Sequence, residues 1–476
     1  MDTTQLEAIV RNILVEKLSS EAAPVAKTSD AAPSAVSATE QAAIFSDVDS
    51  AVEAAQKAYQ RYFQSPLKTR MAIISAIRKE VAPLIPKLSA DAAAETGMGN
   101  THDKILKNQA ALENTPGVED LTTEALTGDD GMVLFEYSPF GVIGSISPST
   151  NPTETIINNT ISMLAAGNTV YFCPHPGAKL VSLWLIEKLE EIAFKASGIR
   201  NLIVTVAKPT FESTQAMMVH PGIALLAVTG GPGIVDAAMK TGKKVIGAGA
   251  GNPPCLVDET AEITTAAQSI VAGASLDYNV PCIAEKSVVV IDSVAVRLIE
   301  QMKVFGAHLL TDPADIEKLR SACFNGSAVN KNMVGRSPAT ILEAAGLHVP
   351  ENEPKLIIFE AAQDDLFVIE EQLMPVLPIV RVKDFEEGLA LSLKIENNLH
   401  HTAIMHSQNV SRLNKVAQLM QTSIFVKNGP SYGGIGVGAE SFNTFTIATP
   451  TGEGTTSARS FARTRRCVLH NGFSIR

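Results

Sequence analysis

Residues 142–174, VIGSISPSTNPTETIINNTISMLAAGNTVYFCP, decide how this chain folds. The segments at either end, 142–148 and 169–174, are short and mostly apolar, which is typical of buried strands. Between them, residues 152–167 begin with a proline and continue as an expected helix. Two buried strands joined by a helix predict a parallel βαβ unit.

The same alternation continues downstream of this unit. Further strands are expected at 202–207, 224–230 and 244–249, and further helices at 177–197, 211–221 and 231–242. A second mixed α/β region follows at about 253–440, and the tail could end in a strand. The expected fold class is therefore α/β, with parallel strands and helices on both faces of the sheet.

The composition restricts the possible functions. The chain has 476 residues, 45% of them hydrophobic, and a net charge of −11. Nucleic-acid binding needs clustered Lys and Arg, so no nucleic-acid partner is expected. No apolar run is long enough to span a bilayer, and Arg11, Glu16 and Lys17 interrupt the start where a secretory signal would be unbroken. Five cysteines without metal-ligand spacing indicate a reduced, cytoplasmic protein with no metal site.

Residues 1–18 are predicted to be an amphipathic helix. Apolar side chains from Leu6 to Leu18 recur at helical spacing, and Thr4 with Glu7 has the spacing of a capping box. Residues 19–41 are rich in Ala, Ser and Pro, which is typical of a flexible linker. A short amphipathic helix on a tether favours a docking peptide, and the alternative is a helix packed on its own domain.

Cys282 is the first candidate for chemistry. It lies in LDYNVPCIAEKSVVV, residues 276–290, in a loop just before an expected strand at 286–292. A cysteine in such a loop can face a cleft and act as a nucleophile once it is ionised. Free cysteine is also among the most buried residue types, and the stretch alone favours a position in the core.

Asn151 is the second candidate, and it directly precedes Pro152. Asn at the cap, Pro at the first helical position and Glu154 three residues after the cap form an ordinary helix start. The side-chain amide of Asn151 could instead donate to a developing oxyanion. The local pattern alone favours the capping role.

Glycine-rich turns are the remaining local signals. Thr229, Gly230 and Gly231 lie between an expected strand and helix, where backbone N–H groups favour an anion. The later stretch GGIGVGAE, residues 433–440, has dinucleotide-site spacing but lacks a strand before it and a helix after it. His400 and His401 are adjacent and lack metal spacing.

Taken together and in order, longer motifs resemble one family. The motifs are ETGMGN, SPSTNPTETIINN, PHPGAK, VTGGPG, GAGAGNPP, EEQLMPVLPIV, HHTAIMHSQN, SIFVKNGPS and TPTGEGTTSAR. Over about residues 42–476 the chain is similar to the aldehyde dehydrogenase superfamily, and within it to the CoA-acylating branch. The N-terminal helix and linker resemble those of members from propanediol-utilisation bacterial microcompartments.

The resemblance implies a domain organisation. It places a Rossmann-like NAD-binding domain at 42–252 and an α/β catalytic domain at 253–440. Strands at about 131–142 and a C-terminal segment at 441–476 would serve oligomerisation. A homodimer or homotetramer is expected on this basis.

The resemblance also implies roles for single residues. Cys282 would be the nucleophile and Asn151 the oxyanion donor, together with the backbone N–H of Cys282. The residues expected at the cofactor are Thr229, Gly230, Gly231, Glu371, Pro174 and His175, with Glu371 on the nicotinamide ribose. His401 is a possible residue for steering CoA or a proton.

Two departures from the family pattern are informative. Hydrolytic members carry a glutamate where this chain has Ala248, which disfavours activation of water and suits a thiol acceptor. Many relatives bind the adenosine ribose with a lysine and a glutamate where this chain has Cys173 and Pro176. These two positions therefore do not decide between NAD and NADP, and NAD is favoured only by the overall resemblance to the family.

The resemblance implies an activity and a location. It implies that propionaldehyde, NAD⁺ and CoA are converted to propionyl-CoA and NADH in propanediol degradation. Residues 1–18 would bind a shell protein and place the enzyme in the lumen of a microcompartment. The alternatives are an acetaldehyde-specific enzyme of the same branch, a hydrolytic dehydrogenase that releases free acid, and a non-catalytic scaffold protein.

Overall fold

The structure is a computed structural model that describes residues 43–475. The helix predicted at 1–18 and the linker predicted at 19–41 lie outside the described residues. Within residues 43–475, no helix is long and apolar enough to cross a membrane.

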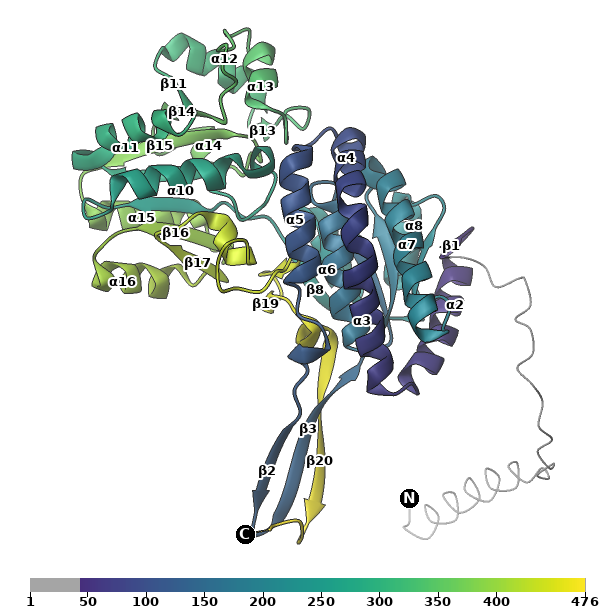
Figure 1. The fold of residues 1–476 in the computed structure, drawn as a ribbon. Helices are drawn as coiled ribbons and strands as arrows, with labels where there is room; N and C mark the ends of the chain where they lie inside the picture. The colour runs from purple at the N-terminus through teal and green to yellow at the C-terminus, as the bar shows by residue number, and fades with distance from the viewer. Residues whose placement is uncertain (1–42, 476) are drawn as a thin grey trace, which may run out of the picture. The chain divides into compact units, whose positions relative to one another are not determined.

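Six parallel strands form the first sheet, in the order β1-β6-β5-β4-β7-β8 (Figure 1). They are β1 (Ile44–Phe45), β4 (Val142–Ser147), β5 (Thr169–Pro174), β6 (Ile203–Val206), β7 (Ile223–Thr229) and β8 (Lys244–Ala248). The chain winds outward from β4 in both directions, so the strand order reverses between β4 and β7. Open α/β sheets bind ligands at this point, beyond the carboxyl ends of the strands. The predicted α/β fold with a parallel sheet is confirmed.

Helices cover both faces of the first sheet. Packed on one face are α2 (Val48–Phe63), α8 (Phe211–Val219) and α9 (Pro232–Met239). The other face carries α6 (Pro152–Ala165) and α7 (Lys179–Ser197), and against these lie α3 (Leu67–Val81), α4 (Ile85–Thr96) and α5 (Thr101–Glu113). We call this sheet and its helices the first lobe.

Local chemistry explains where several of these helices begin and end. The side chains of Asp47 and Asn100 accept backbone N–H groups at the starts of α2 and α5. Gly97 ends α4 in the left-handed conformation, with φ of 62°. The next glycine, Gly99, also has a positive φ and lies against the carboxylate of Asp277, so the turn between α4 and α5 has no room for a Cβ there.

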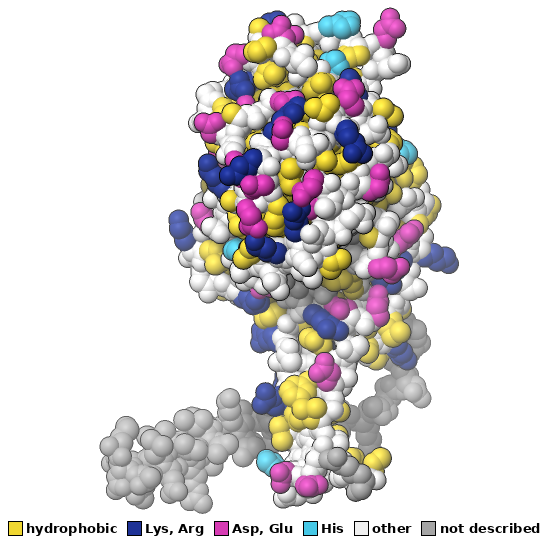
Figure 2. All heavy atoms as spheres, turned by 90° about the vertical axis from the view of Figure 1, so that its left-hand side faces the viewer, with side chains coloured by type: hydrophobic (Ala, Val, Ile, Leu, Met, Phe, Trp, Pro, Cys, Tyr) yellow, Lys and Arg dark blue, Asp and Glu magenta, His cyan; other side chains and the backbone are white. Residues whose placement is uncertain are grey.

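Seven parallel strands form a second sheet, in the order β11-β14-β15-β10-β9-β16-β17. They are β9 (Pro254–Val257), β10 (Ser287–Ile291), β11 (Ala307–Leu310), β14 (Leu356–Glu360), β15 (Val376–Val382), β16 (Thr402–His406) and β17 (Ile424–Lys427). Its helices are α10 (Ile263–Ser275), α11 (Asp292–Val304), α12 (Pro313–Cys323), α13 (Pro338–Ala344), α14 (Leu366–Ile369), α15 (Phe385–Glu396) and α16 (Val410–Met420). We call this part the second lobe. On the face of it shown in Figure 2, acidic and basic side chains are interspersed.

A three-stranded antiparallel ribbon is the third sheet, with the order β2-β3-β20. It joins β2 (Glu124–Gly128) and β3 (Gly131–Pro139) to β20 (Ala462–His470), near the end of the chain. Figure 1 shows the three strands side by side. Nearly every residue of β20 is exposed. The sequence predicted strands at about 131–142 and in the tail, and their use in oligomerisation stays a prediction.

Residues 431–461 lead from the second lobe back to the first lobe before β20 begins. η5 (Ser431–Ile435) still packs on the second lobe, where Ser431 Oγ donates to Glu285 at 2.7 Å. The residues that lie against the first lobe include β18 (Ile447–Ala448), β19 (Gly454–Thr455) and η6 (Ala458–Phe461). Phe461 is buried in the core of the first lobe, and its carbonyl accepts the Asn168 side-chain amide at 2.8 Å. The Asn158 amide donates likewise to the carbonyl of Asn443 at 3.2 Å. The domain boundaries at 252/253 and 440/441 stay predictions.

Candidate active site

A cavity of about 690 Å³ lies at the carboxyl ends of β4, β5, β7 and β8, where the strand order of the first sheet reverses. The loop before β10, from the second lobe, forms part of its wall. Among its lining residues are Asn151, Pro174, His175, Thr229, Gly230, Gly231, Cys282 and Glu371. The structure therefore brings together every residue that was predicted for the site except His401.

Cys282 lies on the cavity wall and is partly exposed, so the interpretation as a core residue is wrong. Its loop follows η4 (Leu276–Asn279) and is held by the buried ammonium group of Lys286. Lys286 Nζ donates to the carbonyls of Asn279 and Pro281, each at 3.1 Å, and to Asn279 Oδ1 at 2.6 Å. The residues just before the thiol are thus fixed by one cation.

The charges around Cys282 set its ionisation. Burial raises the pKa of the Cys282 thiol to about 12, and the Glu371 carboxylate acts in the same direction. Lys286 and Lys107 act in the opposite direction. Burial lowers the pKa of Lys286 itself to about 8. The thiol is therefore protonated near neutral pH, and its ionisation requires added positive charge or a proton acceptor in the cavity.

Asn151 occupies the N-cap position of α6, but its side chain makes no capping hydrogen bond. Its Oδ1 accepts instead from Lys107 Nζ at 2.6 Å, and its Nδ2 makes only a 3.4 Å contact with Thr150 Oγ1. Glu154 does not complete a capping box, because its carboxylate pairs with Lys107 at 3.0 Å. The capping interpretation of Asn151 is wrong, and its Nδ2 is left with one long contact, so it can serve a ligand in the cavity.

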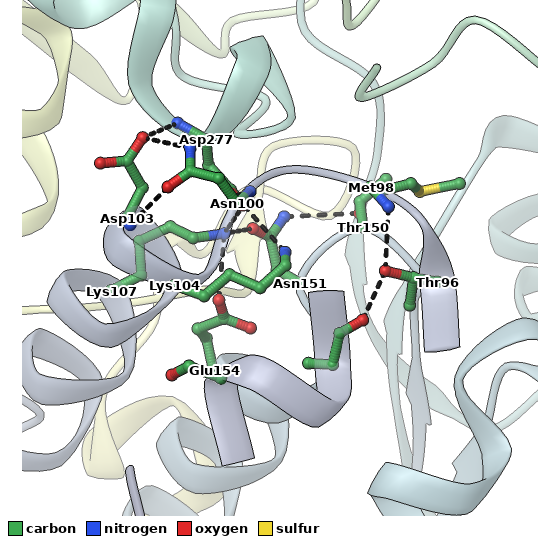
Figure 3. Close-up of polar contacts among 12 residues, drawn as sticks. Thr96, Met98, Asn100, Asp103, Lys104, Lys107, Thr150, Asn151, Glu154 and Asp277 are labelled. Carbon is green, nitrogen blue, oxygen red and sulfur yellow. Dashed lines mark hydrogen bonds and ion pairs between the residues drawn. The ribbon is translucent and has the colours of Figure 1, made fainter. Parts of the chain in front are cut away.

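A buried network of charges lies behind Asn151 (Figure 3). Lys107 Nζ contacts Asp277 Oδ2 at 2.6 Å, and Lys104 Nζ contacts the same oxygen at 2.9 Å. The side chains of both lysines, Asp277 and Glu154 are fully buried. Since α5 belongs to the first lobe and Asp277 precedes Cys282 by five residues, the network joins the two halves of the site.

The turn between β7 and α9 fits an anionic group. Thr229 ends β7, and the N-cap of α9 is Gly231, which has no side chain to cap the helix. A Cβ built on Gly231 or Gly233 would meet no atom within 4 Å, so the space above this turn is open. Backbone N–H groups and the helix dipole favour negative charge there, which suits a cofactor pyrophosphate.

Pro174 and His175 form the wall beyond the end of β5. His175 Nδ1 accepts the N–H of Gly177 at 3.0 Å. Burial lowers the pKa of His175, and nearby Lys331 adds to this effect, so the imidazole is neutral at pH 7. Cys173 and Pro176 also line this wall and offer no carboxylate to a ribose.

Glu371 is the one acidic side chain on the cavity wall among residues 43–475. Its Oε1 accepts the N–H of Gly251 at 3.3 Å. Burial raises the pKa of Glu371 to about 7, against the effect of Lys286. At the end of β8, Ala248 is buried and carries no functional group, as the sequence indicated.

His401 is buried and is not among the residues that line this cavity. Its Nδ1 lies 2.9 Å from Thr402 Oγ1, and its Nε2 has no hydrogen-bond partner among the described residues. Burial lowers the pKa of His401 to about 4, so the ring is neutral. A role of His401 toward CoA stays a prediction. No group of three or more His, Cys, Asp and Glu in residues 43–475 is arranged to hold a metal ion.

Sequence reasoning missed Lys107, Lys286 and Asp277. Lys104 and Lys107 lie three residues apart in an expected helix, a spacing that is typical of a solvated face. Nothing local distinguishes them from surface lysines. Lys286 follows Cys282 by four residues, which is the single sequence signal that could have attracted attention.

Comparison with known proteins gives consistent matches. The sequence profile of the aldehyde dehydrogenase family matches residues 18–439. The chain is 65% identical to the propanal dehydrogenase (CoA-propanoylating) of Salmonella typhimurium, with 100% of both chains covered.

Two solved structures are similar over most of the chain. The Rhodopseudomonas palustris propionaldehyde dehydrogenase with bound CoA and an acylated cysteine is 48% identical, with a TM-score of 0.89 and coverage of 91% of this chain and 99% of that one. A propionaldehyde dehydrogenase from the Clostridium phytofermentans fucose utilisation bacterial microcompartment is 46% identical, with a TM-score of 0.89 and coverage of 92% and 100%.

Proposed function

Because this chain belongs to the aldehyde dehydrogenase family, we propose that its cavity is the site of a CoA-acylating oxidation of propionaldehyde. The chain is an NAD-dependent, CoA-acylating propionaldehyde dehydrogenase, as its full-length identity to the Salmonella typhimurium enzyme supports. The observation that carries the proposal is that Cys282 and the uncommitted amide of Asn151 line one cavity.

The first half-reaction forms a thioester on the protein. The Cys282 thiol first loses its proton to solvent. The thiolate then adds to the aldehyde carbon, and the carbonyl oxygen becomes an oxyanion. The Asn151 amide and the backbone N–H of Cys282 donate to that oxyanion. The thiohemiacetal then collapses, a hydride leaves the former aldehyde carbon, and the acyl group remains on Cys282.

The cofactor fits the wall described above. NAD⁺ bound there supplies the hydride acceptor. The turn from Thr229 to Gly231 would hold its pyrophosphate, Glu371 its nicotinamide ribose, and Pro174 and His175 its adenosine end.

The second half-reaction transfers the acyl group to CoA. The CoA thiol loses its proton to solvent, its sulfur attacks the thioester carbon, the bond from that carbon to Cys282 breaks, and acyl-CoA and the Cys282 thiolate are formed. Ala248 supports a thiol acceptor, since no carboxylate stands at that position to activate water. A covalent intermediate between the two halves makes the kinetics ping-pong.

The test is NADH formation from propionaldehyde and NAD⁺ with and without CoA, with the acyl product identified by mass. We expect turnover that requires CoA and yields propionyl-CoA, and none in Cys282→Ala. Asn151→Ala is expected to lower kcat by about 10²–10³-fold, as for other oxyanion donors. CoA-independent release of propionate would overturn the interpretation of Ala248, and preference for acetaldehyde would overturn the substrate assignment.

We also propose where the enzyme lies in the cell and which kind of protein its N-terminal segment binds. Residues 1–18 bind a shell protein, and the enzyme lies in the lumen of a bacterial microcompartment in the cytoplasm. The Clostridium phytofermentans relative from a microcompartment supports this. Deletion of residues 1–18 should abolish packaging and leave the soluble activity intact. Loss of activity in the truncated protein would instead assign the helix to the catalytic fold.

The ribbon is proposed to build a homodimer or homotetramer. Leu126 and Val468 are both more than half exposed, and both lie opposite Val133, so they form an exposed apolar row across the three strands. Val468→Asp should therefore lower the molar mass measured by light scattering. An unchanged mass in that variant would remove the ribbon from the interface.

A further inference from the structure

We propose that Lys107 is a positioning residue that orients Asn151 as the oxyanion donor and couples it to the loop of Cys282. The inference rests on the proposed function. Lys107 lies on α5 and is fully buried. It does not line the cavity, and it makes no hydrogen bond or ion pair with Cys282. Its ammonium group meets Asn151, Glu154 and Asp277 at once.

The contact with Lys107 fixes which end of the Asn151 amide faces the cavity. An ammonium group has three donors and no acceptor, so the atom 2.6 Å from Lys107 Nζ must be the amide oxygen. A flipped amide would bring N–H groups against the ammonium. Nδ2 therefore lies at the other end, where its only recorded contact is the 3.4 Å one with Thr150 Oγ1. Without Lys107, the Asn151 side chain could turn back and cap α6, as its position in the sequence would predict.

The buried charges explain why the lysine stays charged and in place. Burial acts to lower the pKa of Lys107, but Asp277 and Glu154 outweigh it and hold that pKa above its ordinary value. Two lysines, 104 and 107, stand against two carboxylates, so the buried group is electrically balanced. A cation bonded to the carbonyl oxygen of an amide also polarises the amide, which strengthens its N–H groups as donors.

The same cation reaches the nucleophile through Asp277. The Asp277 carboxylate accepts the backbone N–H of Asn100 at 2.8 Å, and the backbone N–H of Asp277 donates to Asp103 Oδ2 at 2.8 Å. Residues 277–279 all have positive φ, a conformation that must be held by the surrounding contacts. Lys107 thus stands between the oxyanion donor and the strained turn that leads to Cys282.

The test removes the ammonium without leaving a buried unpaired charge. Lys107→Met is combined with Glu154→Gln, and Glu154→Gln alone is the matched control. We expect the double variant to lose on the order of 10²-fold in kcat, with less than a threefold change in the KM for propionaldehyde. The control keeps the Lys107 ammonium against Asn151 and Asp277, so its kcat should stay at least about tenfold above that of the double variant. A double variant that melts near the wild-type temperature and keeps its kcat within threefold would overturn the inference.

A double-mutant cycle separates positioning from a general structural role. If Lys107 acts through Asn151, the Lys107→Met and Glu154→Gln changes should cost little further kcat once Asn151 is alanine. Full additivity would contradict the inference. If the methionine variant does not fold, Lys107→Gln with Glu154→Gln keeps an N–H donor toward Asn151 and is expected to retain more kcat than Lys107→Ala with Glu154→Gln. Equal kcat for these two variants would also refute it.

These outcomes differ from a failure of the proposed function. In that case the wild type itself would form no NADH with propionaldehyde and CoA. Wild-type turnover together with an active Lys107→Met variant would remove only the role of Lys107.

Discussion

The ionisation of Cys282 gives a prediction that can be measured without substrate. With a pKa of about 12, set by burial and by Glu371, a fraction on the order of 10⁻⁴ to 10⁻⁵ of the thiol is ionised at pH 7.5. A free cysteine with a pKa near 8.5 is ionised to about one tenth. The more basic thiolate is the better nucleophile, with a Brønsted slope of about 0.4–0.5, which recovers roughly one to two orders of magnitude. Alkylation of Cys282 should therefore be about 10²-fold slower than that of a free thiol at pH 7.5.

The assay is alkylation by iodoacetamide, with the Cys282 peptide quantified by mass spectrometry between pH 6.5 and 10. N-acetylcysteine added to the same sample serves as the reference free thiol, and Cys282→Ser identifies the background. The rate at Cys282 should keep rising up to pH 10 without a plateau, because the whole range lies below the thiol pKa. The rise should be less than tenfold per pH unit near pH 7 and 8, where Glu371 and Lys286 lose their protons and the thiol becomes harder to ionise. Glu371→Gln should raise this rate above pH 7, where the wild-type carboxylate has lost its proton and its charge opposes ionisation of the thiol. A plateau near pH 8 in the wild type would refute the argument, since it would show a thiolate stabilised by the protein alone.

Two further predictions concern stability. Gly99→Ala would place a Cβ 1.8 Å from Asp277 Oδ1 at a residue with φ of +70°. We therefore expect the free energy of unfolding to fall by roughly 2–4 kcal/mol, measured as a lower melting temperature, together with a loss of kcat. A melting temperature within about 1 °C of the wild type would show that the turn adapts. Burial lowers the pKa of His406 to about 4 from an ordinary 6.5, so the unfolded chain binds a proton before the folded one does, and stability should fall by up to about 3 kcal/mol as the pH drops from 6.5 to 4. His406→Asn should reduce the fall in melting temperature over that pH range by about half, since buried His401 has a similar pKa and contributes the rest. An unchanged slope would show that His406 does not contribute.

The sequence predicted five of the six strands of the first sheet, because these five are short, apolar and largely buried on both faces; β1, with only two residues, was missed. Such strands must alternate with helices, and this local pattern specifies a parallel sheet. The reversal of strand order between β4 and β7 then places the turns after Ser147 and Thr229 at one edge. The turn that we propose for the cofactor could be picked out from the sequence, because an anion site of this kind needs only the end of one strand and the start of the next helix.

The role of Asn151 could not be predicted from local sequence. Cap preferences describe what an asparagine does when nothing else competes for its side chain. Here the ammonium group of Lys107, 44 residues earlier in the chain, donates to Asn151 Oδ1 at 2.6 Å. A charged donor outcompetes a backbone N–H, and only the packing of α5 against α6 brings it there. The resemblance to the family assigned Asn151 to the oxyanion, but it did not indicate the residue that holds its amide.

The return of residues 443–461 to the first lobe has a consequence for biosynthesis. Phe461 completes the hydrophobic core of that lobe, and the amides of Asn158 and Asn168 each donate one of their hydrogen bonds to a carbonyl from the same late stretch. A ribosome makes the first sheet long before it makes these partners. Until residue 461 emerges, the core of the first lobe is incomplete, and each of the two buried amides lacks one of its two acceptors. Premature termination before codon 461 would therefore damage the part of the protein that was translated first.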